Sequence, residues 1–133
     1  MDAFILLADA ATDHPDGTFS LLRAWIDNVF AAGEPVFFRG ALVARIKASV
    51  NEAGKHDFAV KCSNFDGGSI MEPIQGGFVV PEEGGGSQFV VNFGIRLPKF
   101  GKYVFALLIN NKEKDTWTIT ATKVADAAQG EQP

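Results

Sequence analysis

The run from Phe89 to Leu97 alternates large apolar side chains with small or polar ones. Successive side chains of a β-strand point to opposite faces, so this period of two predicts a strand with one face in a core. The segment 42–50 alternates in the same way. Its predicted core face consists of Leu42, Ala44, Ile46, Ala48 and Val50. Two such segments, with turn signals between most of the other apolar runs, predict an all-β fold.

The size and charge of the chain limit its class. A chain of 133 residues has the length of one ordinary domain and can bury a core without a disulfide or a metal. It carries 12 basic and 16 acidic residues, for a net charge of −4. Nucleic acids and anionic membranes are bound mainly through excess Lys and Arg. The sequence therefore predicts neither of them as a partner.

The first residues resemble a strand more than a targeting signal. Asp2 stands where a signal peptide has basic residues, and the apolar run ends at Asp9. No stretch has the length of a transmembrane helix. We therefore expect a cytoplasmic protein.

Turn signals divide the chain into about eight strands. Pro15-Asp16-Gly17 is a turn sequence and predicts a first hairpin between strands 4–10 and 19–29. The second of these segments also fits a helix face, but its aromatic content favours a strand. Segment 51–56 is predicted to close a second hairpin, and 31–40 to be a crossover. Short strands with regular turns favour an antiparallel two-sheet β-sandwich of the Greek-key, immunoglobulin-like type over a barrel. We expect one domain, 1–125, followed by a flexible tail, 126–133.

Two residues have specific structural expectations. Tyr103 follows Phe100-Gly101-Lys102 at the start of a strand, which is typical of a tyrosine corner, where the phenol bonds back to nearby backbone; a plain core tyrosine is the alternative. Cys62, the only cysteine, is in phase with Phe58 and Val60. It is predicted to be a small buried core residue and not a reactive thiol.

Several segments together resemble a known family. They are, in order, Ile5–Ala11, an Asp-Gly turn, Leu42–Ile46, Pro73–Phe78 and Phe100–Phe105. In this pattern the chain is similar to an uncharacterised family of small bacterial proteins, known as a domain of unknown function. The resemblance covers the chain to about Val124 and implies a bacterial single-domain β-sandwich. It implies no active-site residues.

Both histidines fall in loops that would share one end of a sandwich with regularly reversing strands. The loops are 12–18, 51–56, 81–86 and 110–115. Carboxylate-rich loops suit calcium, and imidazole with carboxylate suits zinc. The candidate ligand or metal residues are Asp13, His14, Asp16, His56, Glu82 and Glu83. No metal-ligand spacing or catalytic motif supports them, so we predict no enzyme and no cofactor.

The strand within 102–110 carries a stronger signal, because it is apolar on both faces. Tyr103, Phe105, Leu107 and Ile109 form its predicted inner face. Val104, Ala106 and Leu108 form the other, which something must cover. Either the crossover with Phe37 and Phe38 or a second copy of the chain would do so. We therefore predict a non-catalytic structural or protein-interaction module that self-associates through an apolar interface of Val104, Ala106, Leu108, Phe37 and Phe38. The alternative is a ligand- or metal-binding module at the His14/His56 end.

Overall fold

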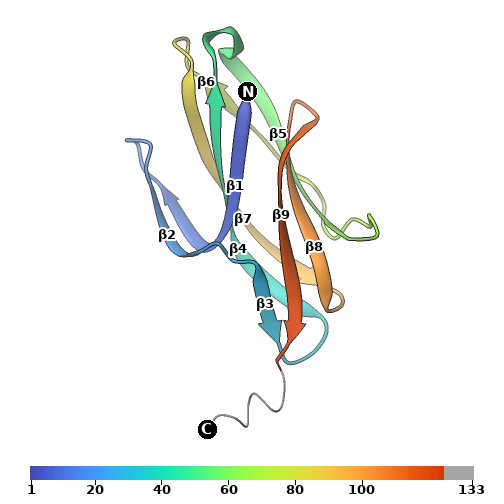
Figure 1. Ribbon diagram of the computed structural model, residues 1–133. Coiled ribbons are helices and arrows are strands. Elements are labelled where there is room, and N and C mark those ends of the chain that lie inside the picture. Colours follow the sequence, from blue (N-terminus) through green and yellow to red (C-terminus); the bar gives the residue numbers. More distant parts are fainter. Residues whose placement is uncertain (125–133) are drawn as a thin grey trace.

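The computed structural model of the chain describes residues 1–124. They form two β-sheets stacked face to face (Figure 1). The elements are β1 (Asp2–Asp13), β2 (Phe19–Ala24), β3 (Asn28–Ala31), β4 (Val36–Ala48), the short 3-10 helix η1 (Val50–Glu52), β5 (Gly54–Asn64), β6 (Ile74–Val80), β7 (Gly85–Leu97), β8 (Gly101–Ile109) and β9 (Lys112–Lys123). The described residues contain no helix with the length and apolarity that crossing a membrane requires.

The strand order is β2-β1-β4-β7 in one sheet and β3-β9-β8-β5-β6 in the other. Every pair is antiparallel except β3 and β9, which run parallel. The prediction of an all-β fold with two sheets is confirmed. The strand count of about eight is wrong by one, because nine strands lie within residues 1–124. The predicted tail, 126–133, lies outside the described residues.

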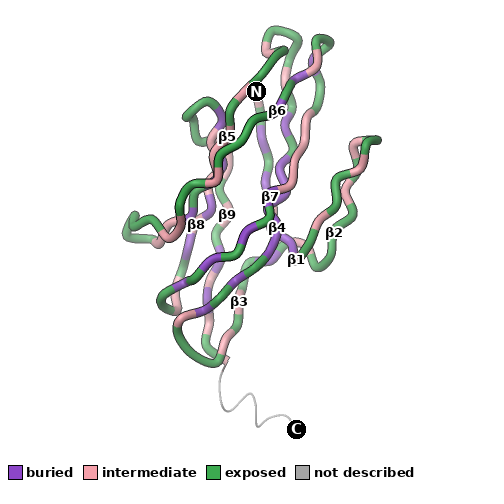
Figure 2. The backbone as a smooth tube through the Cα atoms, turned by 180° about the vertical axis from the view of Figure 1, so that it is seen from behind, coloured by how far each residue is buried: buried purple, intermediate pink, exposed green. Residues whose placement is uncertain are grey.

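The core lies between the sheets and follows the predicted alternation, except that Val50, predicted on the core face of segment 42–50, lies in η1 and is 59% exposed. Along β7, Val91, Phe93, Ile95 and Leu97 are buried, and along β8 Tyr103, Phe105, Leu107 and Ile109 are buried. Figure 2 shows this as alternating buried and exposed positions along the strands. Phe105 packs against Phe93 with ring centroids 5.0 Å apart. Cys62 is buried in the same core, as predicted.

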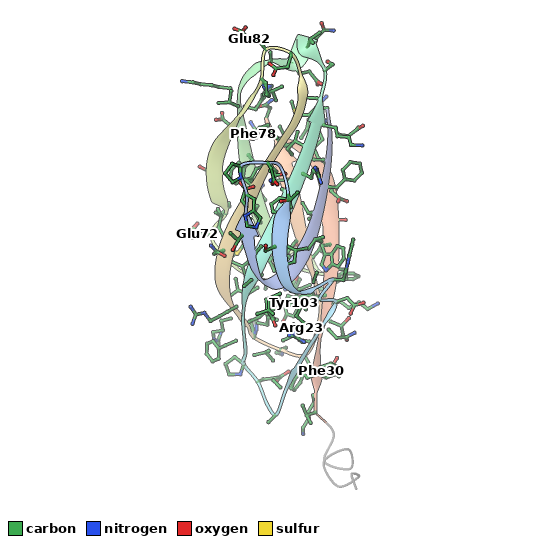
Figure 3. All side chains as sticks on the ribbon, turned by 90° about the vertical axis from the view of Figure 1, so that its left-hand side faces the viewer. Arg23, Phe30, Glu72, Phe78, Glu82 and Tyr103 are labelled. Carbon is green, nitrogen blue, oxygen red and sulfur yellow. The ribbon has the colours of Figure 1, made fainter. Side chains whose placement is uncertain are left out.

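The outer face of the four-stranded sheet is partly covered by its own first hairpin. β1 pairs with β4 through residues 2–8 and with β2 through residues 8–13, so the sheet curls at Ala8. Figure 3 shows the β1–β2 hairpin in front of this sheet. Ala8, Ala41 and Val43 are buried but do not belong to the core between the sheets. The middle of β4 is thus buried on both faces, because Val43, which alternates with the predicted core face of segment 42–50, is buried as well.

The predicted strand 19–29 is interrupted. β2 ends at Ala24, and the chain crosses to the other sheet before β3 begins at Asn28. The crossing is fixed by Ile26, which is buried; its N–H donates to Leu7 O (3.1 Å), and its carbonyl accepts from Trp117 Nε1 (2.6 Å). Arg23 and Trp25 have φ values of 52° and 67° at this bend. Non-glycine residues adopt such left-handed conformations at a cost, so tertiary contacts hold this corner.

Two predicted connections are also wrong. β5 pairs with β6 and β8, not with β4, so segment 51–56 passes from one sheet to the other and closes no hairpin. Segment 36–38 is the start of β4 and not a crossover. Phe38 is only 5% exposed and packs edge-on against Phe93 (5.3 Å) and Phe105 (6.4 Å). It therefore cannot cover the outer face of β8.

Candidate functional site

The predicted His14/His56 site divides into two separate environments. His14 Nε2 lies 2.7 Å from Ser20 Oγ within the β1–β2 hairpin. His56 lies in β5, with Nε2 2.6 Å from Glu52 O and Nδ1 2.9 Å from Asn110 Nδ2. The His56 ring also stacks on Phe78. Each histidine is thus held by its own local contacts.

The predicted acidic residues do not complete a metal site. Asp16 accepts hydrogen bonds from Thr18 Oγ1 (2.6 Å) and N (3.0 Å) in its own turn, which hold the pKa of its carboxyl below the usual range. Asp13 accepts a hydrogen bond from Gln88. Glu82 and Glu83 are exposed in the β6–β7 turn, at the end of the molecule opposite to Phe30 (Figure 3). Among residues 1–124 no three His, Cys, Asp or Glu side chains are grouped so that they could hold a metal ion.

The outer face of β8 is half-buried. Val104, Ala106 and Leu108 face outward, as predicted, and each has an intermediate exposure. The register places Lys61 and Thr116 beside Ala106, and Ser63 and Thr118 beside Val104. Ala59 and Glu113 lie beside Leu108, so most positions next to this apolar stripe are polar, and its three side chains are half-buried.

Several apolar side chains elsewhere are more exposed than these three. Phe37, at the start of β4, is 73% exposed, and Phe30 in β3 is 64% exposed. Both line one depression of about 330 Å³. Val29 and Phe38 belong to its lining too, and they connect it to the core. Polar side chains complete the lining: Asp9, Arg23, Asn28 and Arg39.

Two exposed arginines lie next to Phe37. Arg39 is exposed two residues after Phe37 on the same strand, and Arg96 lies directly opposite Phe37 in the β4–β7 register. Directly opposed residues of antiparallel strands have Cβ atoms about 4.5–5.5 Å apart. We call the set Phe30, Phe37, Arg39 and Arg96 the aromatic–arginine surface. Arg23, beside it, is paired with Asp9 at 2.6 Å and holds the pKa of that carboxyl below its usual range.

Sequence reasoning assigned Phe37 to an interface but missed Phe30, Arg39 and Arg96 as its neighbours. After β2 the chain leaves the four-stranded sheet, and β3 pairs with β9 in the other sheet, where Phe30 lines the same depression as Phe37. The excess of large apolar groups in segment 25–30 was the available signal. Trp25, in the same segment, is 65% exposed and packs on Trp117 at 5.6 Å.

A second, polar cleft lies under the tip of the β1–β2 hairpin. Its volume is about 340 Å³, and its lining includes Asp13, His14, Arg45, Ser87 and Gln88. Arg45 Nη2 donates to Gly17 O at 3.3 Å, which ties the hairpin tip to β4. Two of the predicted ligand residues, Asp13 and His14, therefore share a cleft, but without His56.

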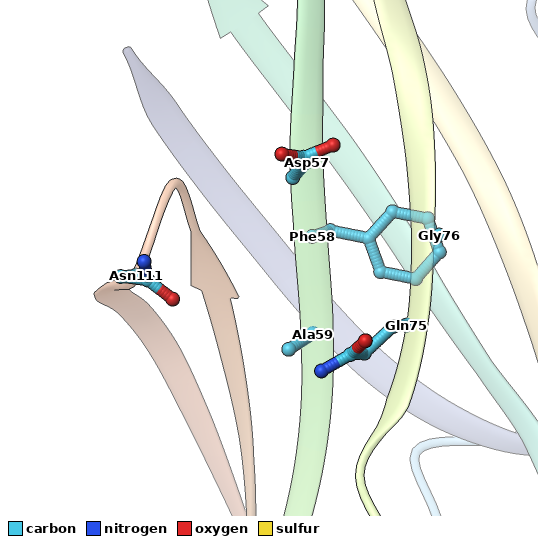
Figure 4. Close-up of a pocket in the computed structure, with 6 residues that line it drawn as sticks. All are labelled: Asp57, Phe58, Ala59, Gln75, Gly76 and Asn111. Atoms are coloured by element: carbon cyan, nitrogen blue, oxygen red, sulfur yellow. The ribbon is translucent and has the colours of Figure 1, made fainter.

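A third hollow, of about 300 Å³, lies against β5 and β6 (Figure 4). Asp57, Gln75 and Asn111 contribute its polar side chains. Gly76 also belongs to the lining. The ring of Phe58 packs directly against this glycine, so that a Cβ on Gly76 would lie 2.6 Å from Phe58 Cζ. Phe58 in turn stacks on Phe89 at 4.1 Å. The glycine therefore serves packing at this position.

Comparisons with known proteins identify a family but no activity. Residues 3–122 match a family of unknown function, DUF6941. No curated protein matches the chain. Among solved structures, a β-glucosidase from Listeria innocua in complex with isofagomine is similar in fold, with a TM-score of 0.52 and 9% identity over 91% of this chain and 16% of that one.

A second solved structure, the alkylpurine DNA glycosylase AlkC of Pseudomonas fluorescens bound to DNA containing an abasic site analog, matches with a TM-score of 0.41 and 12% identity. That match covers 89% of this chain and 30% of the other. The chain thus spans less than a third of either protein. At these identities the likeness to the β-glucosidase concerns the fold alone.

Proposed function

Since the chain belongs to the DUF6941 family, whose function is unknown, we propose its function from the geometry: it is a non-catalytic protein-interaction module. Its contact surface is the aromatic–arginine surface. The observation that carries this proposal is that Phe30 and Phe37, both more than 60% exposed, line one depression beside the exposed Arg39. Aromatic residues and arginine are enriched in protein interfaces and among the side chains that contribute most to binding.

The non-catalytic part of the proposal is supported by how the reactive groups are used. Cys62 is buried, and burial raises the pKa of its thiol to about 12. His56 is held between Glu52, Asn110 and Phe78. A catalytic base or nucleophile needs a free atom aimed at a substrate, and these side chains serve the fold.

The partner is a second copy of the chain or another protein. Self-association was expected through Val104, Ala106 and Leu108. The aromatic–arginine surface fits an interface better, because its two phenylalanines are well exposed whereas these three side chains are half-buried.

Three further proposals concern the protein as a whole: a bacterial origin, a cytoplasmic location and an immunoglobulin-like relationship of the fold.

The small-ligand alternative has one observation in its favour. The polar cleft is lined by Arg45 together with Ser87, Gln88 and His14, and the Asp13 carboxylate in the same lining accepts a hydrogen bond from Gln88. The ion pairs found among residues 1–124 join Met1 to Glu52 and Arg23 to Asp9, so no described carboxylate forms an ion pair with Arg45. An anion such as inorganic phosphate would raise the melting temperature through this cleft. The same anion would have no effect on an Arg45→Gln variant.

Site-specific photocrosslinking in cells tests the interaction function. A benzophenone amino acid replaces Phe37 in the full chain, and a matched chain carries it at Val79, which is exposed on β6. We expect position 37 to give a discrete covalent adduct with a protein identified by mass spectrometry, and position 79 to give none with that protein. No adduct, or the same adduct from both positions, would contradict the proposal.

A further inference from the structure

The arginines of this chain are unevenly placed. The sequence contains four of them, at positions 23, 39, 45 and 96. All four lie on β2, β4 or β7 of the four-stranded sheet. The five-stranded sheet and its loops carry lysines instead. In a chain of net charge −4, this gives one sheet a set of planar cations that can bind carboxylates through two parallel hydrogen bonds.

Three of these arginines, Arg39, Arg45 and Arg96, have no carboxylate partner in the described part of the chain. Among residues 1–124, the carboxylates found in ion pairs are Asp9, which binds Arg23, and Glu52, which binds the Met1 ammonium. Glu34, which precedes β4, accepts a hydrogen bond from Phe100 N at 2.7 Å instead. Arg39 and Arg96 are both exposed, and their positive charges are available to a partner.

The apolar part of the surface lies beside these charges. Phe37 is adjacent to Arg39 on its own face of β4 and to Arg96 across the ladder. Phe30, on β3, lines the same depression as Phe37 and Arg39. A partner that matches this pattern needs an apolar side chain with carboxylates close enough to reach both arginines.

We propose that the aromatic–arginine surface binds an acidic polypeptide segment of a partner protein. An apolar side chain of the segment enters the depression between Phe30 and Phe37, and flanking Asp or Glu carboxylates bind Arg39 and Arg96. This inference rests on the proposed function and names its partner. Nucleic acid fits less well, because its binding depends on neutralising many phosphates and the chain as a whole is acidic.

Peptide selection tests the partner class. The full chain selects from a random peptide library displayed on phage, and selected peptides are synthesised and titrated by fluorescence anisotropy. We expect the selected peptides to share Asp or Glu on both sides of an aromatic or aliphatic residue. Arg39→Gln and Arg96→Gln should each weaken binding about tenfold, as loss of a charge-assisted bidentate contact does, and Phe37→Ser should weaken it as much. Lys47→Gln, which removes an exposed positive charge near the other end of β4, is the matched control and should leave binding unchanged.

Several outcomes would overturn the proposal. These are selected peptides without acidic residues, binding unchanged by Arg39→Gln and Arg96→Gln, or a single-stranded DNA oligonucleotide that displaces the peptides. A dimer that Arg39→Gln dissociates would make the occupant a second copy of this chain. The two proposals can be told apart. If photocrosslinking at position 37 still gives a discrete adduct with one protein, but the selected peptides carry no Asp or Glu, the interaction function stands and only the class of partner is wrong.

Discussion

The hydroxyl of Tyr103 donates a hydrogen bond to the carbonyl oxygen of Lys99 at 2.6 Å, and it accepts one from Lys99 N at 3.2 Å. Tyr103 is buried at the start of β8, and Lys99 lies in the turn from β7, which belongs to the other sheet. One side chain thus fixes the passage of the chain between the two sheets.

Replacing Tyr103 with Phe should destabilise the protein by about 1–2 kcal/mol, because two backbone groups of Lys99 lose their partner in a partly buried turn. Urea unfolding measures the change. The ring stays in the core, so the slope of the transition should be unchanged. A variant as stable as the wild type would show that water replaces the phenol without cost.

The Gly76→Ala variant should be destabilised by about 1–3 kcal/mol, the usual cost of overpacking. The added Cβ would lie 2.6 Å from Phe58 Cζ, and the stack on Phe89 at 4.1 Å hinders the ring from moving away. Gly86→Ala is the control, because the nearest atom to its Cβ is Ile46 O at 3.6 Å. Thermal unfolding of both variants measures the difference. Equal melting temperatures would mean that Phe58 moves freely.

Cys62 should react with a disulfide reagent only after unfolding. The thiolate is the reactive form, and burial both raises the pKa of this thiol to about 12 and blocks access to it. The reaction, followed by absorbance at neutral pH, should be slow in buffer and fast in guanidinium chloride. Comparable rates in both would place the thiol at the surface.

The carboxyl of Glu52 should contribute to stability in a pH-dependent way. Its pKa is lowered to about 2 by the Met1 ammonium at 2.8 Å and by a hydrogen bond from Ser49 N at 2.9 Å. A carboxyl with a lowered folded-state pKa stabilises the fold above its unfolded-state pKa, and that contribution is lost as the pH falls through the folded-state pKa. The stabilising effect is therefore complete above about pH 5 and lost toward pH 2.

Comparison of wild type with Glu52→Gln tests this effect, since glutamine keeps the shape and an acceptor for Ser49 N. The wild type should have the higher melting temperature at pH 6, and the difference should shrink steadily toward pH 2. A difference that is constant over this range would mean that the charge of Glu52 does not contribute.

Local patterns predicted the strands better than their pairing. The alternation in β7 and β8, the buried Cys62 and the corner at Tyr103 follow from nearby residues and were confirmed. The break between β2 and β3 has no such signature, since neither Arg23 nor Trp25 is a residue type that favours a left-handed backbone. Contacts distant in sequence, from Ile26 to Leu7 and Trp117, determine it.

The same limit applies to the candidate surface. Both β4 and β8 are apolar on two faces, and the second face is buried only where another element covers it. The β1–β2 hairpin covers β4 at Ala41 and Val43 and does not cover β8. Phe37 was assigned to the interface as part of a segment that could cover the outer face of strand 102–110. Its neighbours Phe30 and Arg96 come from strands far apart in sequence, and only the sheet order brings them together.

The most direct test of the account is the affinity of the purified chain for the protein captured at position 37, measured by titration calorimetry. Phe37→Ser should weaken binding at least about tenfold, as truncation of a central aromatic side chain does. Val79→Ser, on an exposed position of β6, should bind like the wild type. Equal affinities for wild type and Phe37→Ser would contradict the claim that this surface is where the protein meets its partner.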